Sequence, residues 1–496
     1  MNKFFVFSAL FCGFAGALHA EESGTCGSGC SWTLDDAGVL TVSGKGNTAM
    51  NAHIFNGSDK NIKEVVVEGT ISNVGAFAFN NLPSLEKVTI KEGVQTVSWS
   101  AFGTTPNLTS VTIPSSVTTI ERQAFEKTGI ESISLPSNLT TIGEAAFASS
   151  KLKSITIPSS VTTLGPLAFR YADELESVTL PPNLTSIENY TFEGAKKLKS
   201  INIPEGVTSI GIYAFASTDS LTTVELPSTL KSISERAFEG AKSLQSIDIP
   251  NGVTSIGPLA FDGAESLKSI TLPNTITSIE AYTFRNAKSL ESVDIPEGVT
   301  EIKSNAFVGT AAMETVTFPS TLKTLGEYAF NGSGIKEAIL PEGITELSNL
   351  VFSDCKNLET VVLPSTLTKI GVAAFQSDSK LKTLIIPDSV TSIDDYAFRW
   401  SGLTQIFCEE SQTSMCESAL QRSWININAL KTYTKVGDKY SFDGKLYASL
   451  QDMYNGKEYD EKAASKFDHP SKRIYTVEEA SKASHKSGNR LMIRYK

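Results

Sequence analysis

Apolar and polar residues alternate along most of this chain in one recurring pattern. Between Leu244 and Leu272 it reads L-x-x-I-x-I-P, then V-T-x-I, then A-F, and a short polar turn leads to the next leucine. The alternation before the proline predicts a short strand with one buried face, since side chains point to opposite sides along a strand. The second apolar group predicts an opposite wall of short strand or 3₁₀ pieces, because about ten residues cannot hold a long helix and two turns.

A phenylalanine marks every copy of the pattern. Consecutive copies are 22 or 23 residues apart, a spacing typical of leucine-rich repeats. One copy buries too little apolar surface to fold alone, so the copies must stack. The sequence therefore predicts a solenoid whose turns carry Phe79, Phe102, Phe125, Phe147, Phe169, Phe192, Phe215, Phe238, Phe261, Phe284, Phe307, Phe330, Phe352, Phe375 and Phe398.

The segments on either side of the array differ from it. Residues 21–52 predict a hairpin cap, with strands at 31–34 and 39–43 joined by an Asp-Asp-Ala-Gly turn. The array spans residues 53–408, and residues 409–430 are expected to close its last turn as a C-terminal cap. Residues 431–496 form a tail, in which a capping box starting at Thr476 between two apolar segments predicts strand–helix–strand.

The first 20 residues resemble a secretory signal, with Lys3, an apolar run over residues 4–18 and a small residue at Ala20. Cys12 follows Leu10 and Phe11 rather than small residues, so no lipid attachment is expected there. No other stretch approaches the roughly 18 apolar residues that span a bilayer. We expect a secreted or cell-surface protein without a transmembrane anchor.

The cysteines outside the signal are placed at the ends of the array. In an oxidising compartment the simplest pairing joins Cys26 with Cys30 and Cys408 with Cys416, one pair at each end. Cys355 occupies a position that other copies fill with Ala, Ser or Thr. We interpret it as a small buried thiol rather than a nucleophile.

Charge and chemistry narrow the possible functions. The net charge is −11, and an acidic array with neutral hydroxyl faces is a poor nucleic-acid binder. The histidines outside the signal, His53, His469 and His485, have no metal-ligand spacing. The chain also lacks a phosphate-binding glycine loop, a nucleophile elbow and a zinc signature. We therefore expect neither an enzyme nor a cofactor.

Residues that face outward from the strands change along the array. We call the residue between the last two inward side chains of each strand the strand row. Its first third carries hydroxyls, its middle acquires Glu225, Asp248 and Asp294, and it ends with Ile339, Val362, Ile385 and Phe407. Aligned exposed apolar side chains indicate a protein interface. We slightly favour the alternative, in which residues 409–496 fold back and cover them.

A second row lies two residues before each phenylalanine and is rich in tyrosine. Tyrosine can bury its ring and keep its hydroxyl in water, so packing against the wall is favoured over a ligand-binding row. Members of this row include Leu167, Tyr190, Tyr213, Leu259, Tyr282, Tyr328, Leu350 and Tyr396.

The repeat L-x-x-I-x-I-P-x-x-V-T-x-I-G-x-x-A-F resembles the BspA-like leucine-rich repeats of secreted and surface proteins from host-associated bacteria and some parasitic protists. The segment Cys-x3-Cys-Ser-Trp-Thr-Leu at residues 26–34 resembles a hairpin that often accompanies them. The resemblance implies a mainly β fold: a curved, right-handed leucine-rich-repeat solenoid of about 15–16 turns with a hairpin cap, followed by a small α+β tail. It also implies a role in adhesion.

Two functional hypotheses follow. In the first, the protein binds a host or neighbouring-cell protein through the concave strand face. In the second, it is a structural envelope protein that assembles with itself and is attached through residues 431–496.

Overall fold

A computed structural model describes residues 22–453 apart from 59, 438, 444 and 448–451. The chain divides into two units, residues 1–432 and 433–496, which are described separately below. The expected signal peptide at residues 1–20 and the expected strand–helix–strand of the tail lie outside the described residues.

The first unit begins with a small antiparallel sheet. Strand β1 (Glu22–Gly27) pairs with β2 (Cys30–Leu34), and β2 pairs with β3 (Val39–Ala49). The strands expected at residues 31–34 and 39–43 lie within β2 and β3, and β1 adds a third. Between them the Asp35 carboxylate accepts hydrogen bonds from the amides of Ala37 and Val39 and closes the turn. Strand β3 then pairs in parallel with β4 (Glu64–Val74), where the repeating turns begin.

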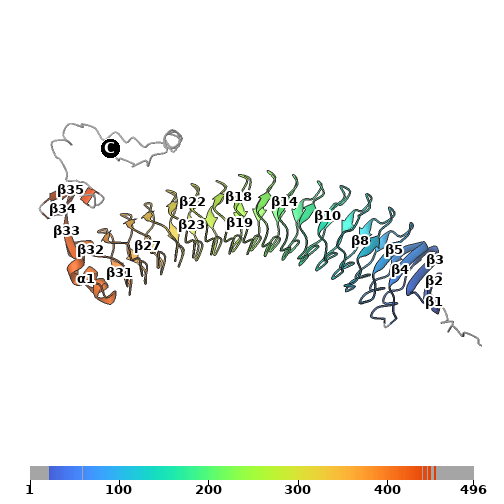
Figure 1. The fold of residues 1–496 in the computed structure, drawn as a ribbon. Coiled ribbons are helices and arrows are strands. Elements are labelled where there is room, and N and C mark those ends of the chain that lie inside the picture. Colours follow the sequence, from blue (N-terminus) through green and yellow to red (C-terminus); the bar gives the residue numbers. More distant parts are fainter. Residues whose placement is uncertain (1–21, 59, 438, 444, 448–451, 454–496) are drawn as a thin grey trace, which may run out of the picture. The chain divides into compact units, whose positions relative to one another are not determined.

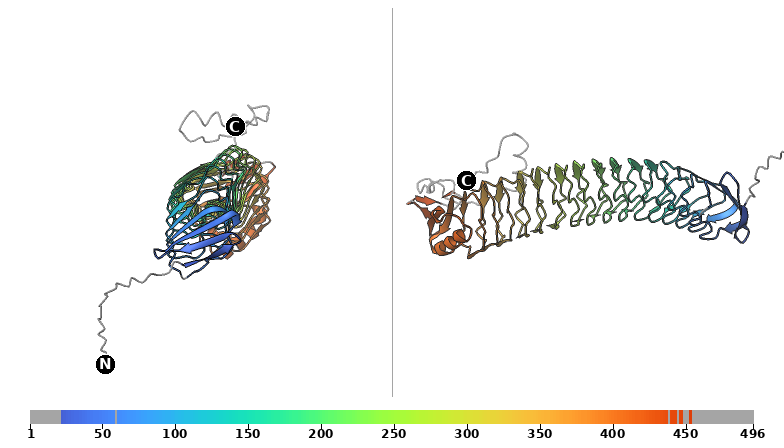
Figure 2. Two further views of the ribbon diagram at one scale, coloured as in Figure 1. Left: turned by 90° about the vertical axis from the view of Figure 1, so that its right-hand side faces the viewer. Right: turned by 60° about the horizontal axis from the view of Figure 1, so that its bottom comes forward.

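After β4 the chain forms a curved stack of turns, about 17 in all, which is slightly more than the 15–16 predicted (Figure 1). Figure 2 shows the same stack from two other sides. The first wall consists of strands of three to five residues, in register from turn to turn, as between Ser200 and Thr223. These strands are β5 (Lys87–Ile90), β7 (Ser110–Thr112), β10 (Ser154–Thr156), β12 (Ser177–Thr179), β14 (Ser200–Asn202), β16 (Thr223–Glu225), β18 (Ser246–Asp248), β20 (Ser269–Thr271), β22 (Ser292–Asp294), β24 (Thr315–Thr317), β26 (Glu337–Ile339), β28 (Thr360–Val362), β30 (Thr383–Ile385) and β32 (Gln405–Glu409).

The second wall carries two-residue strands and turns, in agreement with the expectation of short pieces rather than helices. Its strands are β6 (Thr96–Val97), β8 (Thr119–Ile120), β9 (Thr141–Ile142), β11 (Thr163–Leu164), β13 (Ser186–Ile187), β15 (Ser209–Ile210), β17 (Ser232–Ile233), β19 (Ser255–Ile256), β21 (Ser278–Ile279), β23 (Glu301–Ile302), β25 (Thr324–Leu325), β27 (Glu346–Leu347), β29 (Lys369–Ile370) and β31 (Ser392–Ile393).

The repeated phenylalanines form a continuous stack in the core, which we call the phenylalanine ladder. Neighbouring rings lie 5.1–6.3 Å apart between centroids at interplanar angles of 19° or less. The ladder starts at Phe55, one turn before the first phenylalanine that the sequence pattern identifies, and Trp32 packs edge-on against that ring. The pattern missed Phe55 because it lies 24 residues before Phe79 and follows isoleucine instead of alanine.

Each phenylalanine of the ladder sits between two residues in the left-handed backbone region. The residue two positions before it has φ between 50° and 61°, and the residue two positions after it has φ between 54° and 72°. Around Phe261 this path lets the amides of Leu259, Phe261 and Gly263 donate to carbonyls of the next turn at 2.8–3.0 Å. The same path turns the side chain two positions before the phenylalanine away from the core, which creates the tyrosine-rich row.

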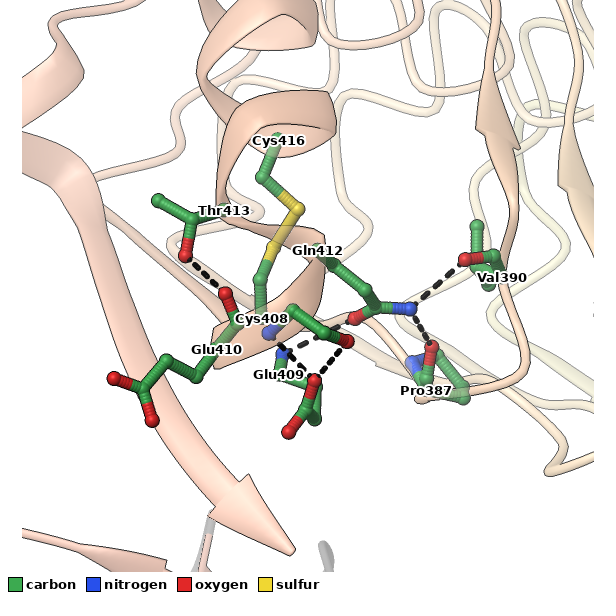
Figure 3. Close-up of a disulfide and its surroundings, with 9 residues drawn as sticks. Pro387, Val390, Cys408, Glu409, Glu410, Gln412, Thr413 and Cys416 are labelled. Atoms are coloured by element: carbon green, nitrogen blue, oxygen red, sulfur yellow. Dashed lines mark hydrogen bonds between the residues drawn. A yellow bond between two sulfur atoms is a disulfide. The ribbon is translucent and has the colours of Figure 1, made fainter.

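The last turn of the array is closed by a short helical cap (Figure 3). The 3₁₀ turn η1 (Glu410–Gln412) leads into helix α1 (Thr413–Arg422), and a disulfide joins Cys408 to Cys416. The Gln412 side chain donates to the carbonyls of Pro387 and Val390, at 2.8 and 2.9 Å.

Two more side chains form hydrogen bonds with backbone groups of that turn. The Arg422 guanidinium donates to the carbonyl of Ile393, and the Ser423 hydroxyl accepts from the amide of Phe398. In earlier turns these backbone groups bond to the next turn of the array, as the Phe375 amide does with Ala397. The cap therefore replaces a missing turn and hides an edge that would otherwise remain open.

The second unit is described only up to residue 453. Strand β33 (Leu430–Val436), preceded by the 3₁₀ turn η2 (Ile427–Ala429), spans the division between the units. It pairs antiparallel with β34 (Lys439–Phe442), which pairs antiparallel with β35 (Lys445–Tyr447). The sequence pattern gave no periodicity here and did not predict this meander.

Candidate interaction surfaces

The strand row lies on the outside of the first wall. In most of the short strands the middle residue points into the core and its two neighbours point out. In β18, for example, Ile247 is buried between exposed Ser246 and Asp248. This arrangement follows from the two-residue period of a strand. The wall thus presents two parallel outward rows, and the earlier one is mostly Ser or Thr.

Acidic residues stand in the middle of the strand row. Glu225 on β16, Asp248 on β18 and Asp294 on β22 are all exposed. The Thr271 hydroxyl donates to Asp248 at 3.0 Å, and the Thr317 hydroxyl donates to Asp294 at 3.3 Å. These bonds link neighbouring turns and fix each carboxylate on the strand face, where it confers negative charge.

The apolar end of the strand row is not uniformly exposed. Ile339 is 55% exposed and lies in register with half-buried Val362, and Ile385 on β30 is also half-buried. Phe407 on β32 is only 9% exposed. The expectation that Phe407 belongs to an exposed apolar face is therefore wrong, and the exposed apolar part of the row ends before β32.

The tyrosine-rich row lies at the surface and packs against arginines. Tyr190 and Tyr213 stack with their centroids 5.2 Å apart, and the guanidinium of Arg236 lies 5.3 Å from the Tyr213 ring. The guanidinium of Arg285 lies 4.8 Å from the Tyr282 ring. Packing against the wall was the favoured interpretation of this row, and it overlooked these cation–π contacts. The signal was available, since arginine follows the ladder phenylalanine at positions 170, 285 and 399.

An exposed aromatic cluster lies at the C-terminal end of the first unit. We use this name for Tyr396, Arg399, Trp400 and Trp424. The guanidinium carbon of Arg399 lies 3.9 Å from the Trp400 ring centroid, 4.2 Å from that of Trp424 and 5.1 Å from that of Tyr396. Trp424 lies beyond the last repeat, so the sequence pattern could not place it beside Trp400.

The described histidine and the two Asp-Asp pairs take part in packing, turns and ion pairs. His53 stacks on Phe77. In the first Asp-Asp pair, Asp35 accepts hydrogen bonds that close the hairpin turn. In the second, Asp394 forms an ion pair with Lys369 at 3.1 Å. Among the described residues, no group of His, Cys, Asp and Glu side chains could hold a metal ion. Within the same residues, no helix has the length and apolar character needed to cross a membrane.

The cysteines occupy both ends of the first unit and its core. Disulfides join Cys26 to Cys30 and Cys408 to Cys416. Cys355 is a free, fully buried thiol that donates to the carbonyl of Phe330. Burial raises the pKa of the Cys355 thiol well above its usual value, so it is a core residue and not a nucleophile.

A buried acid lies next to this thiol. Asp378 is fully buried and accepts a hydrogen bond from the Cys355 amide at 2.9 Å, while its second oxygen has no partner among the described residues. Burial raises the pKa of Asp378 well above 3.8, and the hydrogen bond from Cys355 opposes this shift. Between the unfolded and the folded pKa the folded state binds more protons, so stability falls as the pH rises through that window.

Replacing Asp378 by asparagine should therefore raise the melting temperature, and by more at about pH 7.5 than at about pH 4. Asparagine keeps the acceptor for the Cys355 amide and has the shape of the protonated acid, but it cannot ionise. Calorimetry on both proteins across this pH range measures the difference. An equal shift at both pH values would contradict a neutral Asp378 in the folded state.

This chain is similar to known leucine-rich repeat proteins. The family model of the BspA type leucine-rich repeat region matches residues 48–176, 165–291, 208–336, 254–382 and 323–447. A leucine-rich repeat protein from Bacteroides ovatus is 26% identical, with 74% of this chain and 98% of that chain covered at a TM-score of 0.62. One from Eubacterium ventriosum is 26% identical over 78% and 96% of the two chains, with a TM-score of 0.44. No curated protein sequence matches significantly.

Proposed function

The chain belongs to the BspA type leucine-rich repeat family, and on this premise we propose that it is a secreted or cell-surface protein that binds another protein through its strand row. Proteins of this family are typically surface proteins. The observation that carries the proposal is the contrast between the two sides of each strand. The inward residues remain apolar along the array, while the outward ones change from hydroxyl to acidic to apolar.

The middle and the apolar end of the strand row offer complementary recognition chemistry. Glu225, Asp248 and Asp294 would attract basic side chains of a partner and orient it. Ile339, which is 55% exposed, offers apolar surface with Val362 and Ile385 beside it. A partner that follows the array would meet charge first and apolar contact afterwards, so its direction along the solenoid would be fixed.

Substitutions in the strand row should weaken the binding of a protein ligand. The mature protein is presented to immobilised extracellular-matrix proteins and to whole host cells, and saturable binding is measured by biolayer interferometry and flow cytometry. Asp248→Lys should lower the affinity roughly tenfold through charge repulsion, and Ile339→Asp should do so by removing apolar contact. Both positions are exposed, so the melting temperature should remain close to that of the wild type.

Thr156→Lys is the matched control, because it introduces the same lysine side chain at the hydroxyl end of the strand row. Its affinity should stay close to that of the wild type. Saturable binding that is indifferent to both Asp248→Lys and Ile339→Asp would rule out the strand row as the binding surface, and so would the absence of saturable binding.

A further inference from the structure

The aromatic cluster exposes large aromatic rings to solvent. Within the described residues, the exposed large hydrophobic side chains are aromatic apart from Ile339. Tyr396 at 40%, Trp400 at 59% and Trp424 at 66% exposure come together in one place. Aromatic side chains dominate the apolar surface of cores and interfaces, so a group of them facing solvent indicates a ligand.

The rings are held at a fixed angle to one another. The Arg399 guanidinium lies over one face of each indole, and the two indoles are 6.3 Å apart between centroids at an interplanar angle of 64°. Tyr396 meets Trp424 edge-on at 73° with a centroid distance of 6.4 Å. Both indoles remain largely exposed although the Arg399 guanidinium lies against each of them.

An ion pair lies at the residue that precedes Tyr396 in the chain. The Asp395 carboxylate forms an ion pair with the Arg422 guanidinium, with 2.9 Å between Oδ1 and Nε, and its side chain is 62% exposed. Arg422 is in turn fixed by the Ser418 hydroxyl, at 2.7 Å, and by the Ile393 carbonyl. An exposed carboxylate paired with the cap is therefore the chain neighbour of Tyr396.

We propose that the aromatic cluster binds an oligosaccharide. A pyranose ring presents an apolar face of C–H groups, whose partial positive charge suits the negative face of an indole. Its hydroxyls can donate to the Asp395 carboxylate, an acceptor with several lone pairs. Tryptophan, tyrosine and arginine also occur often in protein interfaces, so binding of a protein instead of a sugar is one of the outcomes of the test below.

This inference is independent of protein binding by the strand row. Tyr396, Arg399 and Trp400 lie on the loop around the last phenylalanine of the ladder, and Trp424 follows α1, so no residue of the cluster belongs to the strand row. The two activities can therefore be abolished separately.

The mature full-length protein is applied to a printed array of neutral, sulfated and sialylated oligosaccharides, and bound sugars are then titrated by calorimetry. Binding of at least one oligosaccharide is expected. Trp400→Ala and Trp424→Ala should each lower its affinity roughly tenfold, whereas Trp424→Phe should retain most of it because the stacking face remains.

Trp99→Ala is the matched control, since Trp99 is 42% exposed and also lies near a guanidinium, that of Arg122 at 5.6 Å, in an early turn. It should leave sugar affinity unchanged, and melting temperatures should show that every variant is folded. The proposal is overturned if no oligosaccharide binds, if the bound sugar is indifferent to both cluster substitutions, or if these substitutions abolish binding of a protein ligand and not of a sugar.

Discussion

Replacing Phe261 by alanine should lower the free energy of unfolding by about 3–5 kcal/mol. The ring is fully buried in the middle of the phenylalanine ladder, 5.4 Å from the Phe238 ring and 5.7 Å from that of Phe284. Its removal costs apolar burial, leaves a cavity and breaks two stacking contacts. Denaturant unfolding followed by circular dichroism gives the magnitude, and hydrogen exchange shows whether the turns on both sides of the cavity lose protection.

Phe398→Ala is the matched control for position in the stack. Phe398 has one ladder neighbour, Phe375, at 6.3 Å, and its other side faces the cap. Because each turn contacts only its neighbours, the loss at the end should be smaller and should affect mainly the last turns. A cost below about 1 kcal/mol for Phe261→Ala would refute the central role of the ladder.

Replacing both Cys408 and Cys416 by alanine should destabilise the last turns by about 2–3 kcal/mol, as expected for the loss of a short disulfide loop. The bond joins two cysteines separated by eight positions in the sequence and ties β32 to α1. The loop between them contains Gln412 and holds the start of α1, and Arg422 and Ser423 at the far end of α1 also bond to the backbone of the preceding turn. Fraying should therefore start at the C-terminal end of the array and be visible as lost amide protection in β30 and β31.

The disulfide at the opposite end provides the control. Removing Cys26–Cys30 should lower protection in β1 to β3 and leave β30 and β31 unchanged, because coupling in a stacked array passes from neighbour to neighbour. If the loss of Cys408–Cys416 lowered protection evenly along the whole array, the cap would not act locally as described.

Much of the fold could be predicted because the repeat encodes it many times. Inward positions such as Leu244, Ile247 and Phe261 recur in every copy, and burial at these positions agrees with the two-residue period of the strands. The prediction failed where copies deviate: Phe55 lies one residue outside the usual spacing, and Phe407 follows the strand pattern but is buried. Periodicity shows which way a side chain leaves the backbone, but it does not show what covers that side chain.

Of the two candidate surfaces, the sequence pattern revealed one and missed the other. The strand row, with Asp248 and Ile339, was found from the sequence because its members recur at one position of the pattern. The aromatic cluster was not found from the sequence, since Trp424 lies after the last copy of the repeat and the pattern gave no partner for Arg399. The capping bonds of Gln412 and Arg422 were missed for the same reason.

The sequence by itself determined that this chain stacks, which residues fill its core and which positions face outward. These properties repeat with every turn, so local alternation and a fixed spacing are enough to define them. Only the tertiary structure decided how the array ends, which outward residues stay exposed and which aromatic rings meet. At the ends the repetition stops, and contacts there depend on a path of the chain that occurs only once.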